Sequence, residues 1–188
     1  MIFIRRLVIC HIIFIFPVVA NVVVTEQGVD ASLRDIARRA GVGLGTLYRH
    51  FPTREALLEA LLRSSFDEFT TKARELETTG SPDGALVSWL RDVVAFTGNY
   101  QGVVDVMMAA KEDTESALHA SCITMRMAGT RLLTRAQAEG MARTDMDGDD
   151  LFSLAAALAW LHNQPSSAPR AEHLFNIIAS AILKNRLI

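Results

Sequence analysis

Polar and basic side chains that can contact duplex DNA gather in one short run of the sequence, Gly45 to His50. Thr46 can donate to a phosphate or touch a thymine methyl group, and Tyr48 offers both a ring and a hydroxyl group. Arg49 and His50 follow directly. The major groove admits a single helix that presents its N-terminal residues to the base edges. The run therefore predicts a recognition helix with DNA-facing side chains.

Motifs that would support catalysis or metal binding do not occur in the sequence, which lacks HExxH, GxSxG and a phosphate-cradling glycine loop. Cys10 and Cys122 stand far apart without CxxC or Cys/His spacing, so we interpret both as buried apolar residues. His119, His162 and His173 also lack metal-ligand spacing and are interpreted as surface or capping residues. We expect a protein that is not an enzyme and holds no metal or cofactor.

Two short helices joined by a glycine turn are predicted to position the recognition residues. The first begins after Ser32, which we expect to form a capping box with Asp35, and it ends at Gly41. The turn occupies Gly43 to Gly45, and the second helix runs from Thr46 to Phe51. This order is the helix-turn-helix arrangement.

The residues that follow predict the start of a third helix that also reaches the nucleic acid. Pro52 ends the recognition helix and Thr53 is expected to cap the next one. Arg54 at its amino end can bind a phosphate, because unpaired N–H groups and the helix dipole attract anions there. Leu47 and Phe51 are expected to anchor the recognition helix to the core of the head.

The run SLRDIARRAGVGLGTLYRHFPTREALLEALL resembles the DNA-binding signature of the tetracycline-repressor (TetR-type) family of bacterial regulators. The resemblance covers about Thr25 to Leu62, and its most specific part is Ile36 to Phe51. It implies a three-helix head, a long connecting helix, an all-α body that binds a small molecule, and dimerisation through the last two helices. By position it implies DNA contacts from Leu44, Gly45, Thr46, Tyr48, Arg49 and His50, and contacts to the DNA backbone from Ser32, Thr53 and Arg54.

The sequence departs from the family pattern at two places. Many members have Ser or Thr where Gly43 stands, so the recognition helix lacks a side-chain cap. The family's first helix usually follows a basic, polar arm, whereas Met1 to Phe16 is apolar after its opening arginines. Two explanations of this apolar segment stay open, a native adaptation or a misassigned start or frame change.

The charge of the chain is divided between its two parts. From Arg34 to Arg63 the sequence has six arginines and three carboxylates, whereas Ser64 to the end has 11 basic and 16 acidic residues. A basic head before an acidic body suits a protein whose head meets a polyanion, because phosphate neutralisation releases counterions. The alternative is a chance cluster of arginines on a solvated surface.

The apolar run from Leu7 to Val24 has two interpretations. Its length and basic start are typical of a secretory signal or a borderline membrane span. His11, Pro17 and Asn21 inside the run argue against that, and we favour a two-turn helix from Val18 to Thr25 that packs the head. We therefore expect a cytoplasmic protein. The alternatives are a membrane-tethered or exported helical interaction protein, or a dimeric ligand-binding bundle whose head is disabled.

The remaining periodicity predicts helices throughout, and half of the 188 residues are apolar, which is enough for a sizeable core. We expect helices over 55–78, 85–97, 103–111, 114–139, 149–162 and 170–187, with a linker over 79–84. The predicted fold is all-α, with a helix-turn-helix head and a helical-bundle body. The predicted domains are an atypical N-terminal segment over 1–24, a DNA-binding domain over 25–63 and a ligand-binding and dimerisation domain over 64–188.

Two sets of side chains in the body are candidates for partner contacts. Large or adaptable side chains that could line a cavity for a hydrophobic or aromatic effector are Trp89, Phe96, Tyr100, Met107, Met108, Met125 and Trp160. Residues expected at the homodimer interface are Leu151, Leu154, Leu158, Leu174, Ile177, Ile178 and Ala181. The sequence thus predicts a DNA-binding transcriptional regulator, with a repressor released by its effector as the favoured form.

Overall fold

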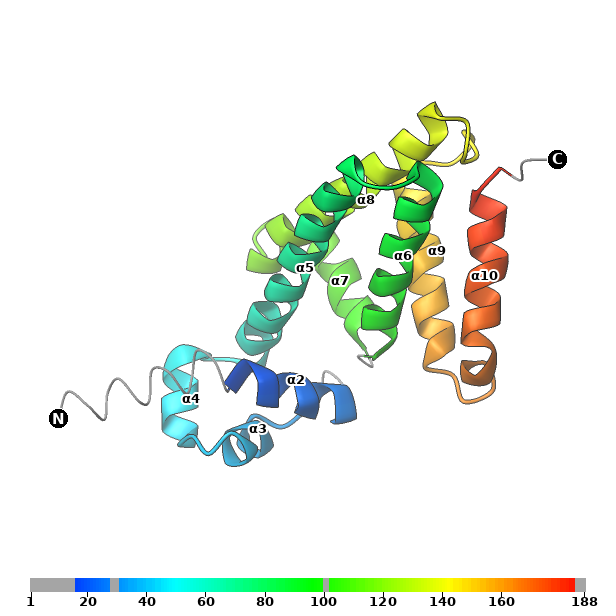
Figure 1. The fold of residues 1–188 in the computed structure, drawn as a ribbon. Helices are drawn as coiled ribbons and strands as arrows, with labels where there is room; N and C mark the ends of the chain where they lie inside the picture. Colours follow the sequence, from blue (N-terminus) through cyan, green and yellow to red (C-terminus); the bar gives the residue numbers. More distant parts are fainter. Residues whose placement is uncertain (1–15, 28–30, 100–101, 185–188) are drawn as a thin grey trace.

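The computed structural model describes residues 16–27, 31–99 and 102–184, and over these ranges the chain is helical. The only bridge between extended residues in these ranges joins Ala142 and Leu183. The helices up to His50 form a head, and the helices after it form a body above and beside the head (Figure 1). The predicted all-α class and the order of head before body are confirmed.

The head contains α2 (Phe16–Gln27), α3 (Leu33–Arg39) and α4 (Leu44–His50). Helix α2 is longer at both ends than the predicted helix and holds Pro17 in its first turn, where a missing N–H is tolerated. Helices this short are marginal alone in water, so a shared core must hold them. The buried side chains of that core are Ala20, Val23, Ala31, Ile36, Ala37, Ala40 and Leu47.

The turn between α3 and α4 is set by Gly41, whose φ of 65° ends α3. The N–H of Gly41 donates to the carbonyl of Arg38 and that of Val42 to the carbonyl of Ala37, at 3.3 and 3.0 Å. These two bonds form a Schellman motif. Gly43 is the N-cap of α4, so this helix starts at Leu44, earlier than the predicted Thr46.

The predicted capping box at the start of α3 is wrong. Ser32 is the N-cap residue, but its side chain makes no capping hydrogen bond. Asp35 instead accepts from Arg38 at 2.7 Å and from Gln27 at 3.3 Å, and these bonds hold the pKa of its carboxyl below its ordinary value. A guanidinium at close range is a stronger partner for a carboxylate than a neutral backbone N–H.

Helix α5 (Arg54–Thr78) connects head and body as one continuous helix. Thr53 caps it as predicted, because its hydroxyl oxygen accepts from the Ala56 N–H at 3.1 Å. Leu57, near its start, is as deeply buried as Phe66 in its middle. Since α5 contacts α2 near one end and packs along α8, movements of the body can reach the head through it.

The body continues with α6 (Pro82–Asn99), α7 (Val103–Glu112), α8 (Ala117–Ala138), α9 (Gly148–His162), a short 3-10 helix (Ala168–Arg170) and α10 (Ala171–Ile182). The linker before α6 is shorter than predicted, because Pro82 begins that helix, where proline is well tolerated. Helix α8 starts after Ser116, whose hydroxyl caps it, and not at Thr114. A capping box between Asp147 and Asp150 starts α9.

The centre of the body depends on a close approach at Gly129 of α8. Trp89 of α6 and Phe152 of α9 pack edge to face there, with ring centroids 5.9 Å apart. The Trp89 indole N–H donates to the carbonyl of Phe69 at 2.8 Å, so its buried polar group is satisfied. A Cβ atom on residue 129 would lie 2.4 Å from the Trp89 ring and 3.0 Å from the Phe152 ring.

We therefore expect Gly129→Ala to destabilise the protein by about 1–3 kcal/mol, because neither buried ring can move without opening the core. Urea unfolding measures this. Gly45→Ala is a matched control, since a Cβ there meets nothing within 4 Å and alanine favours a helix by up to about 1 kcal/mol. Equal effects of the two substitutions would contradict this account of the core.

In the described ranges, no helix is both long enough and apolar enough to cross a lipid bilayer. Half of the apolar run from Leu7 to Val24 lies outside these ranges, in residues 7–15, and the other half lies in α2. The predicted domain boundaries fall inside α2 and α5, which continue across positions 24 and 63.

Candidate nucleic-acid interface and candidate effector cavity

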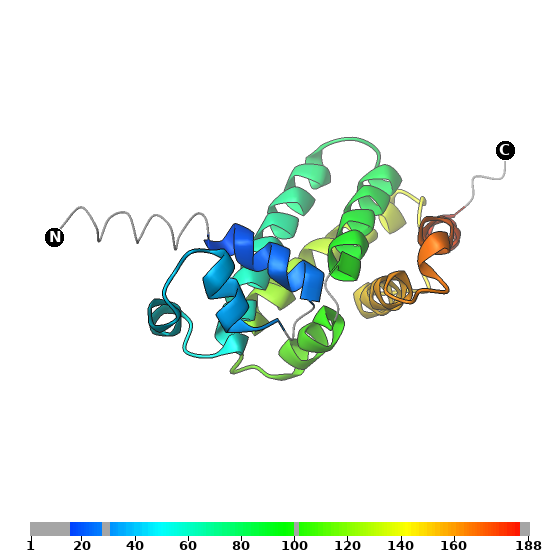
Figure 2. The ribbon, with the colours of Figure 1, turned by 90° about the horizontal axis from the view of Figure 1, so that it is seen from below.

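Helix α4 lies at one extreme of the molecule and α10 at the other, as two perpendicular views show (Figures 1 and 2). The exposed face of α4 carries Gly45, Tyr48, Arg49 and His50, and 46% of Tyr48 is accessible. Leu47 points the other way and is only 2% exposed. Helix α4 therefore presents a polar face while one apolar side chain fixes it to the head.

The side chain of Arg49 lies back along its own helix. Its Nε donates to the Gly45 carbonyl at 3.3 Å, and Nη2 donates to the Thr46 hydroxyl oxygen at 3.4 Å. Both bonds are long and solvent-exposed, so they order the guanidinium but are weak enough to be exchanged for bonds to another acceptor. Thr46 and Leu44 are half-buried beside this face. The predicted recognition residues thus all lie on α4, over its whole length.

The three residues predicted to touch the DNA backbone occupy helix starts. Ser32 is exposed at the start of α3, with no cap bond from its side chain. Thr53 is exposed and caps α5, and Arg54 is the first residue of that helix. Phosphates are favoured at such positions, because backbone N–H groups and the dipole point outward.

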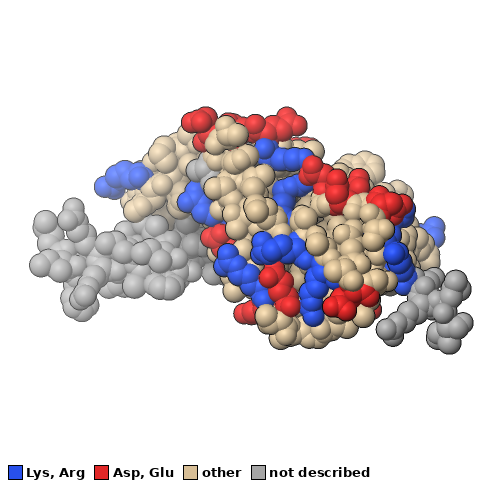
Figure 3. Space-filling view, turned by 90° about the horizontal axis from the view of Figure 1, so that it is seen from above, with Lys and Arg blue, Asp and Glu red and all other residues tan. Residues whose placement is uncertain are grey.

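The positive charge of the head is partly neutralised on α3. Arg38 pairs with Asp35 at 2.7 Å, and Arg39 pairs with Glu26 at 2.5 Å. Arg34 and Arg49 have no ion pair within the described part of the chain and are exposed. On the face of the body turned away from the head, basic and acidic side chains are interspersed (Figure 3). Such a mixed surface does not favour a polyanion, so the head is the better candidate.

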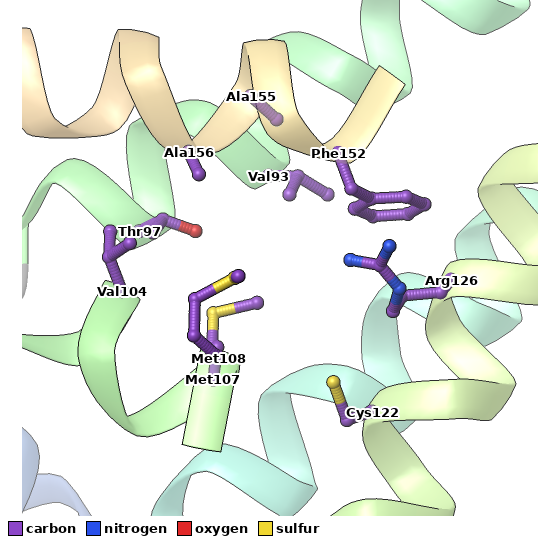
Figure 4. A pocket seen from close by; sticks show the side chains of 10 residues that line it. All are labelled: Val93, Thr97, Val104, Met107, Met108, Cys122, Arg126, Phe152, Ala155 and Ala156. Atoms are coloured by element: carbon purple, nitrogen blue, oxygen red, sulfur yellow. The ribbon is translucent and has the colours of Figure 1, made fainter. Parts of the chain in front are cut away.

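A small apolar cavity lies within the body between α6, α7, α8 and α9 (Figure 4). Its volume is about 30 Å³. Its walls are formed by Val93, Thr97, Val104, Met107, Met108, Cys122, Arg126, Phe152, Ala155 and Ala156. Pockets that hold small molecules usually measure about 300–1,000 Å³, so this cavity must widen to admit an effector.

The cavity wall contains two of the predicted effector residues, Met107 and Met108. Trp89 and Met125 are fully buried in the core behind it. Phe96 packs edge to face against Phe69, with ring centroids 5.3 Å apart. Trp160 is 57% exposed on α9, away from the cavity wall, and Tyr100 lies outside the described residues. Side-chain size alone did not separate core residues from cavity residues.

Eight of the ten lining residues were missed by sequence reasoning, and Arg126 is the charged one among them. Its side chain is 15% exposed, and its guanidinium carbon lies 4.3 Å from the centre of the Phe152 ring. Burial also raises the pKa of the neighbouring Cys122 thiol, which keeps it protonated. The available signal was a charge beside the apolar stripe that contains Cys122 and Met125.

The outer surfaces of α9 and α10 form a second apolar region. Ile177 is 50% exposed. An open groove of about 370 Å³ beside the two helices is lined by apolar residues that include Leu154, Ile178 and Ala181, and by the charged Arg143, Asp145 and Asp150. Leu151 and Leu158 are 0% and 5% exposed, because both point into the chain's own core. They offer almost no surface to a second chain, so the prediction for these two residues needs correction.

Among the described residues, no cluster of three or more His, Cys, Asp or Glu side chains could hold a metal ion.

Comparisons with known proteins match both parts of the chain. Residues 18–61 match the model of the family described as bacterial regulatory proteins, tetR family. Residues 81–182 match the model of the C-terminal domain of SbtR-like transcriptional regulators. The two matches divide the chain into the head with the start of α5, and the body from α6 to α10.

Individual relatives agree with these matches. The transcriptional repressor KstR2 of Rhodococcus jostii is 36% identical over 63 residues, which are 33% of this chain and 31% of that protein. KstR2 of Mycobacterium tuberculosis is 26% identical over 143 residues, 72% of each chain. The crystal structure of the TetR transcriptional regulator SCO0520 from Streptomyces coelicolor is 32% identical, with a TM-score of 0.67 over 90% of this chain and 97% of that one.

The model of the C-terminal domain alone matches more than half of the chain. The N-terminal model covers α4 with its exposed face and α3 before it. The chain therefore belongs to the TetR family of bacterial transcriptional regulators.

Proposed function

We propose that this regulator is a homodimeric repressor that inserts α4 into the major groove of its operator and leaves the DNA when an effector enters the body. The observation that carries the proposal is the two-sided character of α4, which buries Leu47 and exposes Tyr48 and Arg49. A helix held in this way can enter a groove without losing its support in the head.

Within this proposal, Thr46, Tyr48 and Arg49 contact base edges or nearby phosphates, with His50 at the end of the same helix. Arg49 exchanges its long internal hydrogen bonds for bonds to a base or phosphate. Ser32, Thr53 and Arg54 contact the DNA backbone and fix the register. The DNA-binding unit then consists of α2, α3, α4 and the first turns of α5.

A two-fold dimer is needed because one seven-residue helix reads only a half-site, and paired heads read two half-sites a helical turn apart. The outer faces of α9 and α10 suit this role. Trp160 is 57% exposed and is proposed at the interface and not in the cavity, since exposed tryptophans often act as anchors between subunits. The proposed interface comprises Leu154, Trp160, Leu174, Ile177, Ile178 and Ala181.

The effector is proposed to act by linkage through α5. Widening of the cavity shifts α8, which packs along α5, and α5 repositions the head. Operator affinity then falls by the coupling free energy, typically about 1–3 kcal/mol. Repression is the favoured direction because the KstR2 relatives are transcriptional repressors.

Gel shifts on the DNA that flanks its own gene test this function. We expect retention at least about a thousandfold stronger than with a scrambled duplex, and a steep loss of affinity as salt is raised, because phosphate contacts release counterions. Equal retention of both duplexes would refute sequence-specific binding. Dimerisation is measured separately by sedimentation, so that a failure of either step can be recognised.

A further inference from the structure

The cavity combines an apolar wall with one charged group. Arg126 extends from α8 toward the cavity and lies under the Phe152 ring, opposite Thr97 and Val104 (Figure 4). A mostly buried guanidinium is costly unless a carboxylate or another acceptor pairs with it. The partner of this guanidinium therefore bears on what the cavity can bind.

The partner is Asp149, in the first turn of α9, which accepts from Arg126 Nη2 at 2.5 Å. Asp149 also accepts from Lys111, near the end of α7, at 3.1 Å. These two bonds hold the pKa of the Asp149 carboxyl below its ordinary value, so it is charged at neutral pH. One carboxylate thus joins α7, α8 and α9 at the edge of the cavity.

The pairing is unequal in exposure. The side chain of Asp149 is 69% exposed, whereas that of Arg126 is 15% exposed. An exposed carboxylate loses little hydration when it leaves a partner, but the guanidinium needs a replacement inside the protein. The bonds that the described residues supply to the guanidinium use Nη2 alone, which leaves its other N–H groups for a second acceptor.

The rest of the wall suits an apolar body. Met107 and Met108 project from α7, and 49% of Met108 is accessible from outside. Methionine side chains are flexible and polarizable, so they can move aside and pack again on a ligand. Movement of α7 requires that its bond through Lys111 to Asp149 loosens.

We propose that the effector is an organic acid with an apolar body, whose carboxylate replaces Asp149 on Arg126 and so breaks the ion pair that holds α9 to α8. The apolar body occupies the space opened by Met107 and Met108, between the Phe152 ring and Thr97. This inference rests on the proposed function, because it names the ligand class of the same cavity. Binding changes the body because one anion displaces another at the junction of three helices.

Competition between the two carboxylates makes a specific prediction. Asp149→Asn removes the competing charge and should tighten the binding of a carboxylate by several-fold or more. Arg126→Met keeps an apolar side chain of similar length and should weaken it by about tenfold to a hundredfold, as expected for loss of a charge-assisted bond. Arg126→Lys keeps the charge but not the planar fork, so its affinity for the carboxylate should lie between those of the wild-type protein and Arg126→Met.

Isothermal titration calorimetry with two matched probe pairs tests this inference. The pairs are octanoate with 1-octanol, and 4-phenylbutanoate with 4-phenyl-1-butanol. In each pair the apolar body is nearly the same and the charge differs.

We expect at least one acid to bind the wild-type protein at least about tenfold more tightly than its alcohol. This preference should vanish in Arg126→Met and grow in Asp149→Asn. Asp92→Asn is the matched control, because the side chain of Asp92 is 39% exposed and pairs with Lys72 outside the cavity and outside the proposed interface.

Three results would overturn the inference: alcohols that bind as tightly as acids, no binding of any probe at millimolar concentration, or equal loss of acid and alcohol in Arg126→Met. Should Arg126→Met fail to fold, as judged by circular dichroism, the Asp149→Asn measurement decides the question. Gel shifts on ligand-free protein separate this test from the proposed function. Specific DNA retention without acid binding defeats only the inference, and acid binding without retention defeats only the function.

Discussion

Replacing Tyr48 or Arg49 by alanine is expected to weaken operator binding by about tenfold to a hundredfold each, which corresponds to about 1–3 kcal/mol. Both side chains are exposed on α4, so neither substitution removes a buried contact. We therefore expect the free energy of unfolding to change by less than about 0.5 kcal/mol. Quantitative gel shifts and urea unfolding on the same preparations measure the two effects.

Arg74→Ala is the matched control, because Arg74 is an exposed arginine of α5 in the body. It removes the same charge from the chain and should leave operator affinity within about twofold at fixed salt. The salt dependence also distinguishes the roles. If Arg49 contacts a phosphate, its removal lowers the salt slope by about one; if it contacts a base, it relaxes sequence preference instead. Equal losses from Arg49→Ala and Arg74→Ala would rule out α4 as the recognition helix.

Ile177→Asp should convert the dimer into monomers and remove most operator binding with it. Ile177 is 50% exposed on α10 and is one of the apolar residues proposed as the interface. In a two-fold dimer each substitution occurs twice, and each introduced carboxylate would be buried without a partner. At about 2 kcal/mol or more per copy, dimerisation weakens by about a thousandfold.

Sedimentation over a concentration series measures this effect directly. Met127→Asp provides the control, since Met127 is 59% exposed on α8 and receives the same change from an apolar to a charged side chain. It should remain dimeric and keep its operator affinity. A dimer that survives Ile177→Asp but not Met127→Asp would place the interface on another face of the body.

Much of the head could be predicted from local chemistry. Gly41 ends α3 because glycine adopts a positive φ without steric cost, and Thr53 starts α5 because its hydroxyl accepts a backbone N–H. These effects involve residues close together in the chain. The wrong prediction at Ser32 is also a local effect. Arg38, three residues after Asp35, binds the carboxylate that the capping box needed.

The cavity and the surfaces of the body required the tertiary structure. Trp89 and Trp160 have the same side chain, yet one is fully buried and the other is 57% exposed. That difference depends on which face of α6 or α9 meets its neighbours, and on Gly129 leaving room for the Trp89 ring. Periodicity marks an apolar face, but it does not say whether the chain's own core or another molecule covers that face.

The sequence by itself determined the all-α class and the helix-turn-helix head, because caps, turns and helical periodicity act over a few residues. The regulatory function followed from the resemblance of that head to the TetR-type signature. Only the tertiary structure decided that Arg126 and Lys111 both meet Asp149 at the edge of an apolar cavity, and that Leu151 and Leu158 belong to the core. These contacts join residues far apart in the chain, and packing of whole helices sets them.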